Sequence, residues 1–170
     1  MFDKLLEILK AIWNDLMPYY IVTEMELSCV LRFGKFRRVS GPGVHAKIPF
    51  AEVPYTYHVK TCTAHLTAQT LTTADIKPKT IVVKAIVRYH IFDIKSYVTK
   101  VWDAQDAIND TIQGIIGDII KNSTWDAIVE GIEDAITAKA AAMLEEWGIR
   151  IERVTLSDLA EIRTYRLIQA

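Results

Sequence analysis

The spacing of apolar residues changes four times along this chain, and each change predicts a different structural element. Over residues 1–17 apolar side chains recur at i, i+3 and i+4, the spacing of an amphipathic helix, and Pro18 ends it. From about residue 19 to 94 the period falls to two, which is typical of half-buried strands. In the longest predicted strand, residues 80–91, one face is expected to carry Ile81, Val83, Ala85 and Val87.

Helical spacing returns after Asp93, where a short helix is expected to begin. Residues 103–121 then predict a long helix with one apolar side, made by Ile108, Ile112, Ile115, Ile116, Ile119 and Ile120. Ser123 or Thr124 is expected to cap a second long helix, and Gly148 ends it because glycine adopts a left-handed backbone easily. The predicted buried side of that helix is Ile128, Ile132, Ile136, Ala140, Met143 and Trp147.

The last part of the chain predicts a returning strand over residues 149–156 and a helix beginning at Asp158. Strands followed by helices and one more strand indicate an α+β fold, a mainly antiparallel sheet with helices packed on one side. The expected boundaries are an amphipathic N-terminal helix at 1–18, the domain at 19–158, and the start of a C-terminal coiled-coil helix at 159–170.

Glycine and proline mark two sharp turns between the early strands. Gly34 is expected to reverse the chain, and Gly41-Pro42-Gly43 forms a corner in which both glycines are free to take positive φ. Pro49 is expected to end the strand that follows, because it has no backbone N–H to donate. These residues predict a scaffold rather than a reactive site.

Composition and charge narrow the function. A chain of 170 residues, half of them apolar, fits one domain with a hydrophobic core. With 20 basic and 21 acidic residues the net charge is −1, so no strong positive field would gather nucleic-acid phosphates. We therefore expect no nucleic-acid partner.

The reactive residue types do not form a convincing site. Strand alternation places His58 and Cys62 on one face and His65 on the other, which is wrong for shared metal coordination. Ser28 lies in a predicted strand, and the chain has neither a nucleophile-elbow motif nor a phosphate-binding glycine loop. Cys29 and Cys62 are expected to be free and at least half-buried, and whether either is lipidated stays open. We expect no catalytic residue, no cofactor and no metal.

The apolar face of the N-terminal helix must be covered by something. It comprises Phe2, Leu5, Leu6, Leu9, Ile12, Trp13 and Leu16, and burying about six of these seven side chains yields roughly 10 kcal/mol before ordering costs. No window of the chain approaches the ~18 apolar residues of a membrane span. A bilayer interface, a partner helix and the domain itself all remain possible occupants.

Six ordered landmarks resemble the SPFH domain family, also called Band 7 or PHB, which includes stomatins, prohibitins, flotillins and regulators of bacterial membrane proteases. They are Arg32-Phe33-Gly34-Lys35, Gly41-Pro42-Gly43-Val44-His45 through Pro49, Thr73-Ala74-Asp75, Val87 through Asp93, Gly114-Ile115-Ile116-Gly117, and Glu146-Trp147-Gly148 through Asp158. His45, Asp75, Asp93 and Asp158 are, by this resemblance, structural residues.

The resemblance implies a non-enzymatic, membrane-associated scaffold that forms homo-oligomers, organises a membrane patch or restrains a protease or channel, and lies peripherally on the cytoplasmic side. Two arginines common in the family are missing, near Gln113 and near Glu130, which puts its usual assembly contacts in question. Two rivals are a soluble, monomeric lipid- or ligand-binding module and a hydrolase using Ser28 or His45.

Overall fold

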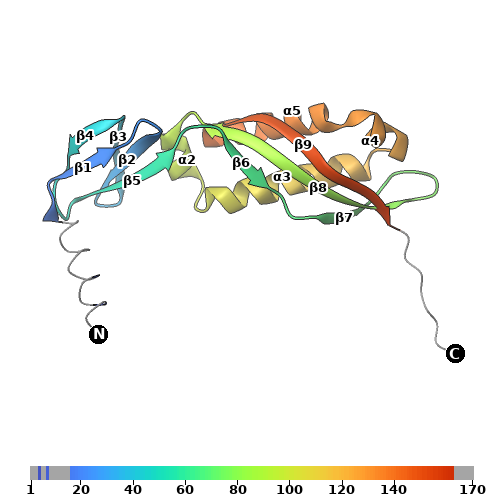
Figure 1. Cartoon of the computed structure of the whole chain (residues 1–170), viewed down its shortest axis with the longest axis horizontal. Coiled ribbons are helices and arrows are strands. Elements are labelled where there is room, and N and C mark those ends of the chain that lie inside the picture. Colours follow the sequence, from blue (N-terminus) through green and yellow to red (C-terminus); the bar gives the residue numbers. More distant parts are fainter. Residues whose placement is uncertain (1–3, 5–6, 8–15, 163–170) are drawn as a thin grey trace.

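The computed structural model describes Lys4, Glu7 and residues 16–162, and the chain extends along one long axis as two lobes (Figure 1). We call residues 19–58 the N-terminal lobe and residues 62–162 the main lobe. Strands β1 to β5 make the N-terminal lobe. Within residues 19–162, all of the helices lie in the main lobe. Every strand pairing in the described residues is antiparallel, which confirms the predicted α+β class.

The N-terminal lobe consists of a ribbon and a small sheet. The ribbon pairs β1 (Tyr19–Val22) with β4 (Gly43–Ala46). The sheet has β2 (Glu26–Arg32) in its centre, between β3 (Lys35–Ser40) and β5 (Glu52–His58). The turn between β2 and β3 has positive φ at Phe33 (49°) and Gly34 (77°), so the predicted reversal at Gly34 is confirmed.

The main lobe is built around β8 (Thr80–Ile91), the strand predicted at these residues. One edge of β8 pairs with β6 (Cys62–His65) and then β7 (Gln69–Thr72), and the other edge pairs with β9 (Ile149–Ile162). The predicted apolar face of β8 is buried, whereas Lys84 and Arg88 on the opposite face are exposed. Only one face of this sheet is therefore covered.

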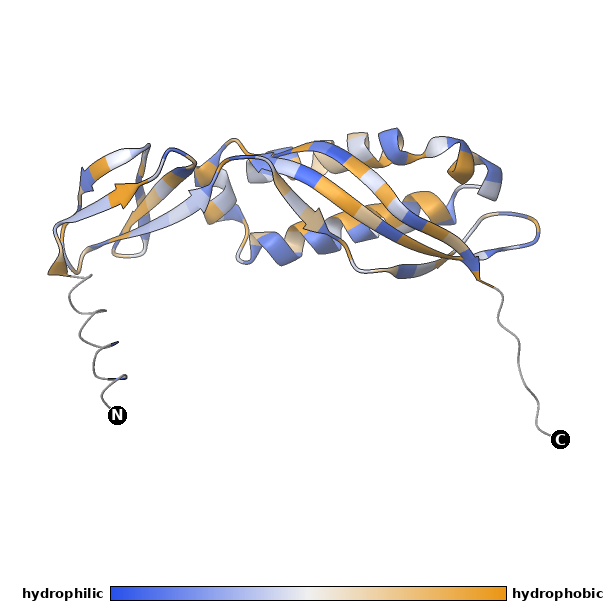
Figure 2. Cartoon of the chain, in the orientation of Figure 1, coloured by the Kyte–Doolittle hydropathy of each residue, from blue (hydrophilic) through white to orange (hydrophobic). Residues whose placement is uncertain are grey.

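Helices α3 (Ala104–Lys121) and α5 (Glu133–Leu144) contribute most of that cover (Figure 1). The isoleucines of α3 meet β8 and α5 in one core, in which Ile108, Ile112, Ile120, Ile136 and Val154 have 0% exposure. Figure 2 shows orange runs along the central strands, and helices on which orange and blue segments alternate. The predicted apolar side of α3 is confirmed.

A short helix joins the two lobes. In α2 (Ile94–Lys100), Ile94 packs with Ile91 and with the fully buried Cys29 of β2. The ring of Tyr97 lies edge-on to Tyr57 of β5, at 5.4 Å between centroids. The lobes are thus connected by apolar packing as well as by the chain.

Two sequence predictions about helices were wrong. The second long helix is divided into α4 (Trp125–Gly131) and α5, because Gly131 takes φ +120° and breaks the helical backbone. Met143 is half-exposed, and Leu144 takes the buried position instead. Short 3-10 helix η1 (Glu145–Trp147) completes the segment before Gly148.

The helix expected from Asp158 is not formed in the described residues. Strand β9 continues to Ile162, where it pairs with Thr80, so residues 158–162 belong to the sheet. A bulge lies where the pairing passes from Leu156 to Asp158. The remainder of the expected coiled-coil segment, 163–170, lies outside the described residues.

Candidate functional site

Large apolar side chains are exposed on the N-terminal lobe. In the ribbon, Ile21 stands directly opposite Val44, and they are 64% and 70% exposed. Tyr19 precedes them on the same strand, and Leu16 lies just before the ribbon begins. In Figure 2 the arrowhead of β1 is orange, whereas the start of the strand is pale blue.

Two loop tips add phenylalanines to this surface. Phe33 is 80% and Phe50 is 76% exposed, and both have positive φ. The Phe33 amide donates to the carbonyl of Ala51 at 3.0 Å, so the two loops lie side by side. We define the docking surface as these exposed residues of the lobe and of the segment that enters it: Leu16, Tyr19, Ile21, Phe33, Val44, Ile48 and Phe50.

A buried carboxylate holds these loops and strands together. The Glu52 side chain, 1% exposed, accepts from Arg32 Nη2 at 2.8 Å and from Arg38 Nη1 at 3.1 Å. Its second oxygen accepts from the Ile48 amide at 3.1 Å, and Arg38 also donates to the Ala46 carbonyl at 2.6 Å. Glu52 therefore connects β2, β3, β5 and the loop that carries Ile48 and Phe50.

The charge on Glu52 is stabilised in spite of its burial. Burial by itself raises the pKa of Glu52, but the hydrogen bonds from Arg32, the Ile48 amide and Arg38 outweigh it and hold the pKa below the ordinary 4.5. Sequence reasoning missed this group, because the partners stand 14 and 20 residues away and no local motif joins them.

The Gly-Pro-Gly corner supports the ribbon, but β4 ends at Ala46, before the Pro49 that was expected to end it. His45 Nε2 lies 2.7 Å from the Gly41 carbonyl, and its ring lies 5.5 Å from that of Tyr20. Gly43 has φ +127°, whereas Gly41 does not use the positive φ that it was expected to be free to take. After Pro42 the strand runs from Gly43 to Ala46, and Pro49 lies in the turn that follows it. His45 thus has a structural hydrogen bond.

Asp75 links two distant segments of the main lobe. Its Oδ2 accepts from the Thr73 hydroxyl at 2.6 Å and from the Trp125 amide at 3.0 Å. The Thr73 hydrogen bond is the largest cause that lowers the pKa of Asp75. Thr124 occupies the N-cap position of α4, but its side chain makes no capping bond. The first backbone amide of the helix, that of Trp125, instead donates to Asp75, fifty residues away in the sequence.

Gly148 and Asp93 meet at the start of α2. The backbone amides of Phe92 and Asp93 both donate to the Gly148 carbonyl, at 2.9 and 3.1 Å. A Cβ on Gly148 would lie 2.1 Å from the Asp93 carbonyl oxygen, and Gly148 has φ +78°. Asp93 caps α2 through the Lys95 amide and the Ser96 hydroxyl. Glycine is required here for space and for backbone conformation alike.

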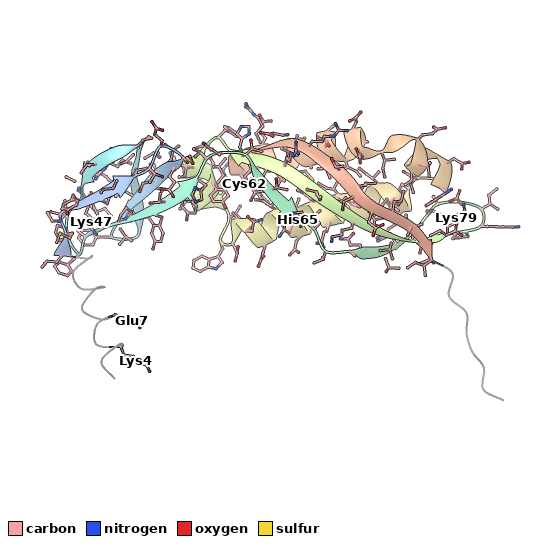
Figure 3. All side chains as sticks on the ribbon, in the orientation of Figure 1. Lys4, Glu7, Lys47, Cys62, His65 and Lys79 are labelled. Carbon is pink, nitrogen blue, oxygen red and sulfur yellow. The ribbon has the colours of Figure 1, made fainter. Side chains whose placement is uncertain are left out.

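The remaining candidate residues lie apart from one another. Asp158 is exposed on β9 opposite Lys84. Figure 3 labels Cys62 and His65 on β6, where Cys62 packs against the core and His65 is exposed. His58 lies on another strand, β5, where its Nε2 is 3.6 Å from Oε1 of Glu26. Burial raises the pKa of the Cys29 thiol.

Neither a metal cluster nor a spanning helix is present in the part of the chain that the structure describes. No three His, Cys, Asp or Glu side chains of those residues are arranged to hold a metal ion. No helix among them is long and apolar enough to cross a membrane. Of the predicted contact residues in the N-terminal helix, only Leu16, 51% exposed, lies within the described residues.

Comparison with known proteins identifies the family. Residues 20–166 match the model of the SPFH domain / Band 7 family, and the chain belongs to that family. It is 29% identical to an uncharacterized protein of Archaeoglobus fulgidus over 154 residues, 88% of this chain and 61% of that protein. It is 28% identical to Stomatin-like protein 3 of Mus musculus, over 88% of this chain and 52% of the relative. It is also 28% identical to Stomatin-1 of Caenorhabditis elegans, over 82% of this chain and 43% of that relative.

The resemblance inferred from six sequence landmarks is therefore confirmed. The chain spans 43% to 61% of the length of these three relatives. What the full-length relatives do as whole proteins is accordingly treated as a proposal for this chain.

Proposed function

We propose that this chain is a non-enzymatic, membrane-associated scaffold that docks on a bilayer through its N-terminal lobe and self-assembles there. The observation that carries the proposal is the docking surface, at the end of the molecule where residues 1–17 join the described lobe. Soluble monomers seldom expose a large contiguous apolar patch, and such patches mark protein or membrane contact sites.

The composition of the surface favours a bilayer. Tyr19 is an aromatic residue of the kind enriched at membrane interfaces, and Phe33 and Phe50 are presented on loop tips. The N-terminal lobe carries five basic and three acidic residues, although the whole chain has a net charge of −1. Lys35 and Arg37 are exposed on β3 and would attract anionic lipid headgroups.

Self-assembly would strengthen a weak individual attachment. One lobe buries only a few side chains in an interface, whereas many lobes held in one assembly bind with much higher avidity. The N-terminal helix predicted at residues 1–18 would add its apolar face to the same contact. On the cytoplasmic side of a membrane, such an assembly would organise a lipid patch or restrain a protease or channel.

Vesicle flotation of the full chain tests the docking surface. Exchanging Ile21 and Val44 for aspartate places two charges in the ribbon. Each apolar side chain buried in the membrane contributes about 1.5–3 kcal/mol to binding, so the double variant is expected to bind anionic vesicles at least tenfold more weakly. The matched control is Val129→Asp, which changes a 60% exposed residue of α4 in the main lobe. Flotation of the ribbon variant that equals a clear flotation of the wild type would contradict docking through the ribbon. A wild type that does not float would favour a soluble module.

A further inference from the structure

A second apolar surface lies at the junction of the lobes, around Trp102. This side chain is fully exposed in the loop between α2 and α3. It borders two adjoining hollows of about 270 and 240 Å³, and both share Tyr57, Val98 and Val101 as walls. We call these four residues the Trp102 groove. Asp103 lines its rim, and Asp106 follows on the first turn of α3.

The far end of the main lobe carries a projecting apolar residue with a basic neighbour. Ile76 is fully exposed at the tip of the hairpin between β7 and β8, beside the exposed Lys77 and Pro78. Figure 3 labels Lys79 at this end and Lys47 at the opposite end of the molecule.

The hairpin tip is held in one conformation by its own hydrogen bonds. The Thr73 amide donates to the Lys79 carbonyl at 3.1 Å, and the Lys79 amide donates to the Thr73 hydroxyl at 3.1 Å. The bonds of Asp75 to Thr73 and Trp125 anchor the tip to α4. A preformed projection loses little conformational entropy when it binds.

We propose that the hairpin tip of one copy of this chain docks into the Trp102 groove of the next copy, with Ile76 against Trp102 and Lys77 beside Asp103. The inference deepens the proposed function, on which it rests, by assigning the contact that joins the subunits. Charge complementarity favours a second copy as the occupant, because the chain itself offers a basic apolar projection and an acidic-rimmed aromatic groove. Exposed tryptophan is also a frequent centre of binding energy in interfaces.

The geometry makes the contact head-to-tail. The tip and the groove lie at different places along the molecule, so a chain's own tip does not cover its own groove (Figure 1). Each copy would use its groove for one neighbour and its tip for another. Such a heterologous contact repeats until it closes as a ring or grows as a filament.

Two complementary variants test the contact in the full chain in mild non-ionic detergent. Trp102→Ala retains the tip and Ile76→Asp retains the groove, so each variant alone is expected to lose all species larger than the monomer. An equimolar mixture still contains one intact contact and is expected to form a dimer of one variant with the other, and nothing larger. Native mass spectrometry, with a mass tag on one variant, measures the species.

The controls separate this inference from the proposed function. Val129→Asp is expected to assemble as the wild type does. The Trp102 and Ile76 side chains are fully exposed, so both test variants are expected to have the unfolding midpoint of the wild type. If either variant alone assembles as the wild type does, the head-to-tail contact is wrong, whereas the proposed scaffold function is not contradicted. A wild type that stays monomeric overturns both. Loss of vesicle flotation by Trp102→Ala with assembly intact would assign the groove to lipid and overturn the inference.

Discussion

The two lobes distribute their apolar and polar residues in opposite ways. The main lobe buries a continuous core of aliphatic side chains between β8, β9 and the helices. The N-terminal lobe buries few apolar residues, Val22, Cys29 and Val30, and also buries polar ones, Ser28, Ser40 and Glu52. Several of its larger apolar side chains are exposed instead, among them Ile21, Phe33, Val44 and Phe50 of the docking surface.

The difference indicates a division of roles. Burial of apolar area dominates folding stability, so the main lobe is expected to provide most of the stability of the chain. The N-terminal lobe depends more on the Glu52 ion pairs and on α2, and its apolar surface remains available for contact. The docking surface is therefore expected to tolerate substitutions that the main-lobe core does not.

Truncating the main-lobe core should produce the largest effect. Ile112→Ala removes a side chain with 0% exposure, and isoleucine-to-alanine changes in packed cores cost about 2–5 kcal/mol because they leave a cavity. We expect about 3 kcal/mol less unfolding free energy by urea denaturation. The matched variant Val44→Ala on the docking surface should change it by less than about 0.5 kcal/mol. Comparable losses from both variants would contradict the division between the lobes.

The sequence predicted the main lobe well because its signals are local and periodic. Alternation in residues 80–91 and isoleucine spacing in residues 104–121 each follow directly from facing one core. The end of β9 was mispredicted because its structure depends on pairing with a distant strand rather than on a local signal. Leu159, Ala160 and Glu161 favour a helix by intrinsic propensity, but pairing with β8 overrides that preference.

The candidate surfaces were less predictable, because they depend on contacts between distant residues. Nothing near Glu52 in the sequence indicates that Arg32 and Arg38 will bind it, and Asp75 meets Trp125 across fifty residues. The exposure of Ile21 and Val44 was equally hidden, since a period-two pattern does not say which of two apolar faces is covered.

Breaking the Glu52 cluster should have an intermediate effect. Glu52→Gln leaves Arg32 and Arg38 without their carboxylate, and removing one partner of a buried ion pair is strongly destabilising. Because the two arginines are each more than a third exposed, we expect a loss of about 2 kcal/mol at pH 7 rather than the full cost. The exposed Glu24→Gln serves as the control and should leave stability unchanged.

The effect of Glu52→Gln should depend on pH in a defined direction. A folded pKa below the ordinary 4.5 means that the charged form stabilises the fold above pH 4.5, and this contribution is lost as pH falls through the folded value. The difference between wild type and variant should thus be constant from pH 7 to pH 5 and shrink below 4.5. A difference that grows on acidification would show that the carboxylate is not held charged by its arginines.

The smallest effect is expected at Asp75, on the surface of the main lobe. Asp75→Asn replaces a carboxylate oxygen with an amide group, so it weakens acceptance from Thr73 and from the Trp125 amide, which share Oδ2. We expect a decrease in unfolding midpoint smaller than that of Glu52→Gln, together with faster hydrogen exchange of the Trp125 amide. Asp158→Asn, at a second family-motif position that is exposed on the surface, is the control and should change neither quantity. Unchanged exchange at Trp125 in the Asp75 variant would mean that the start of α4 is held by its helix packing rather than by this carboxylate.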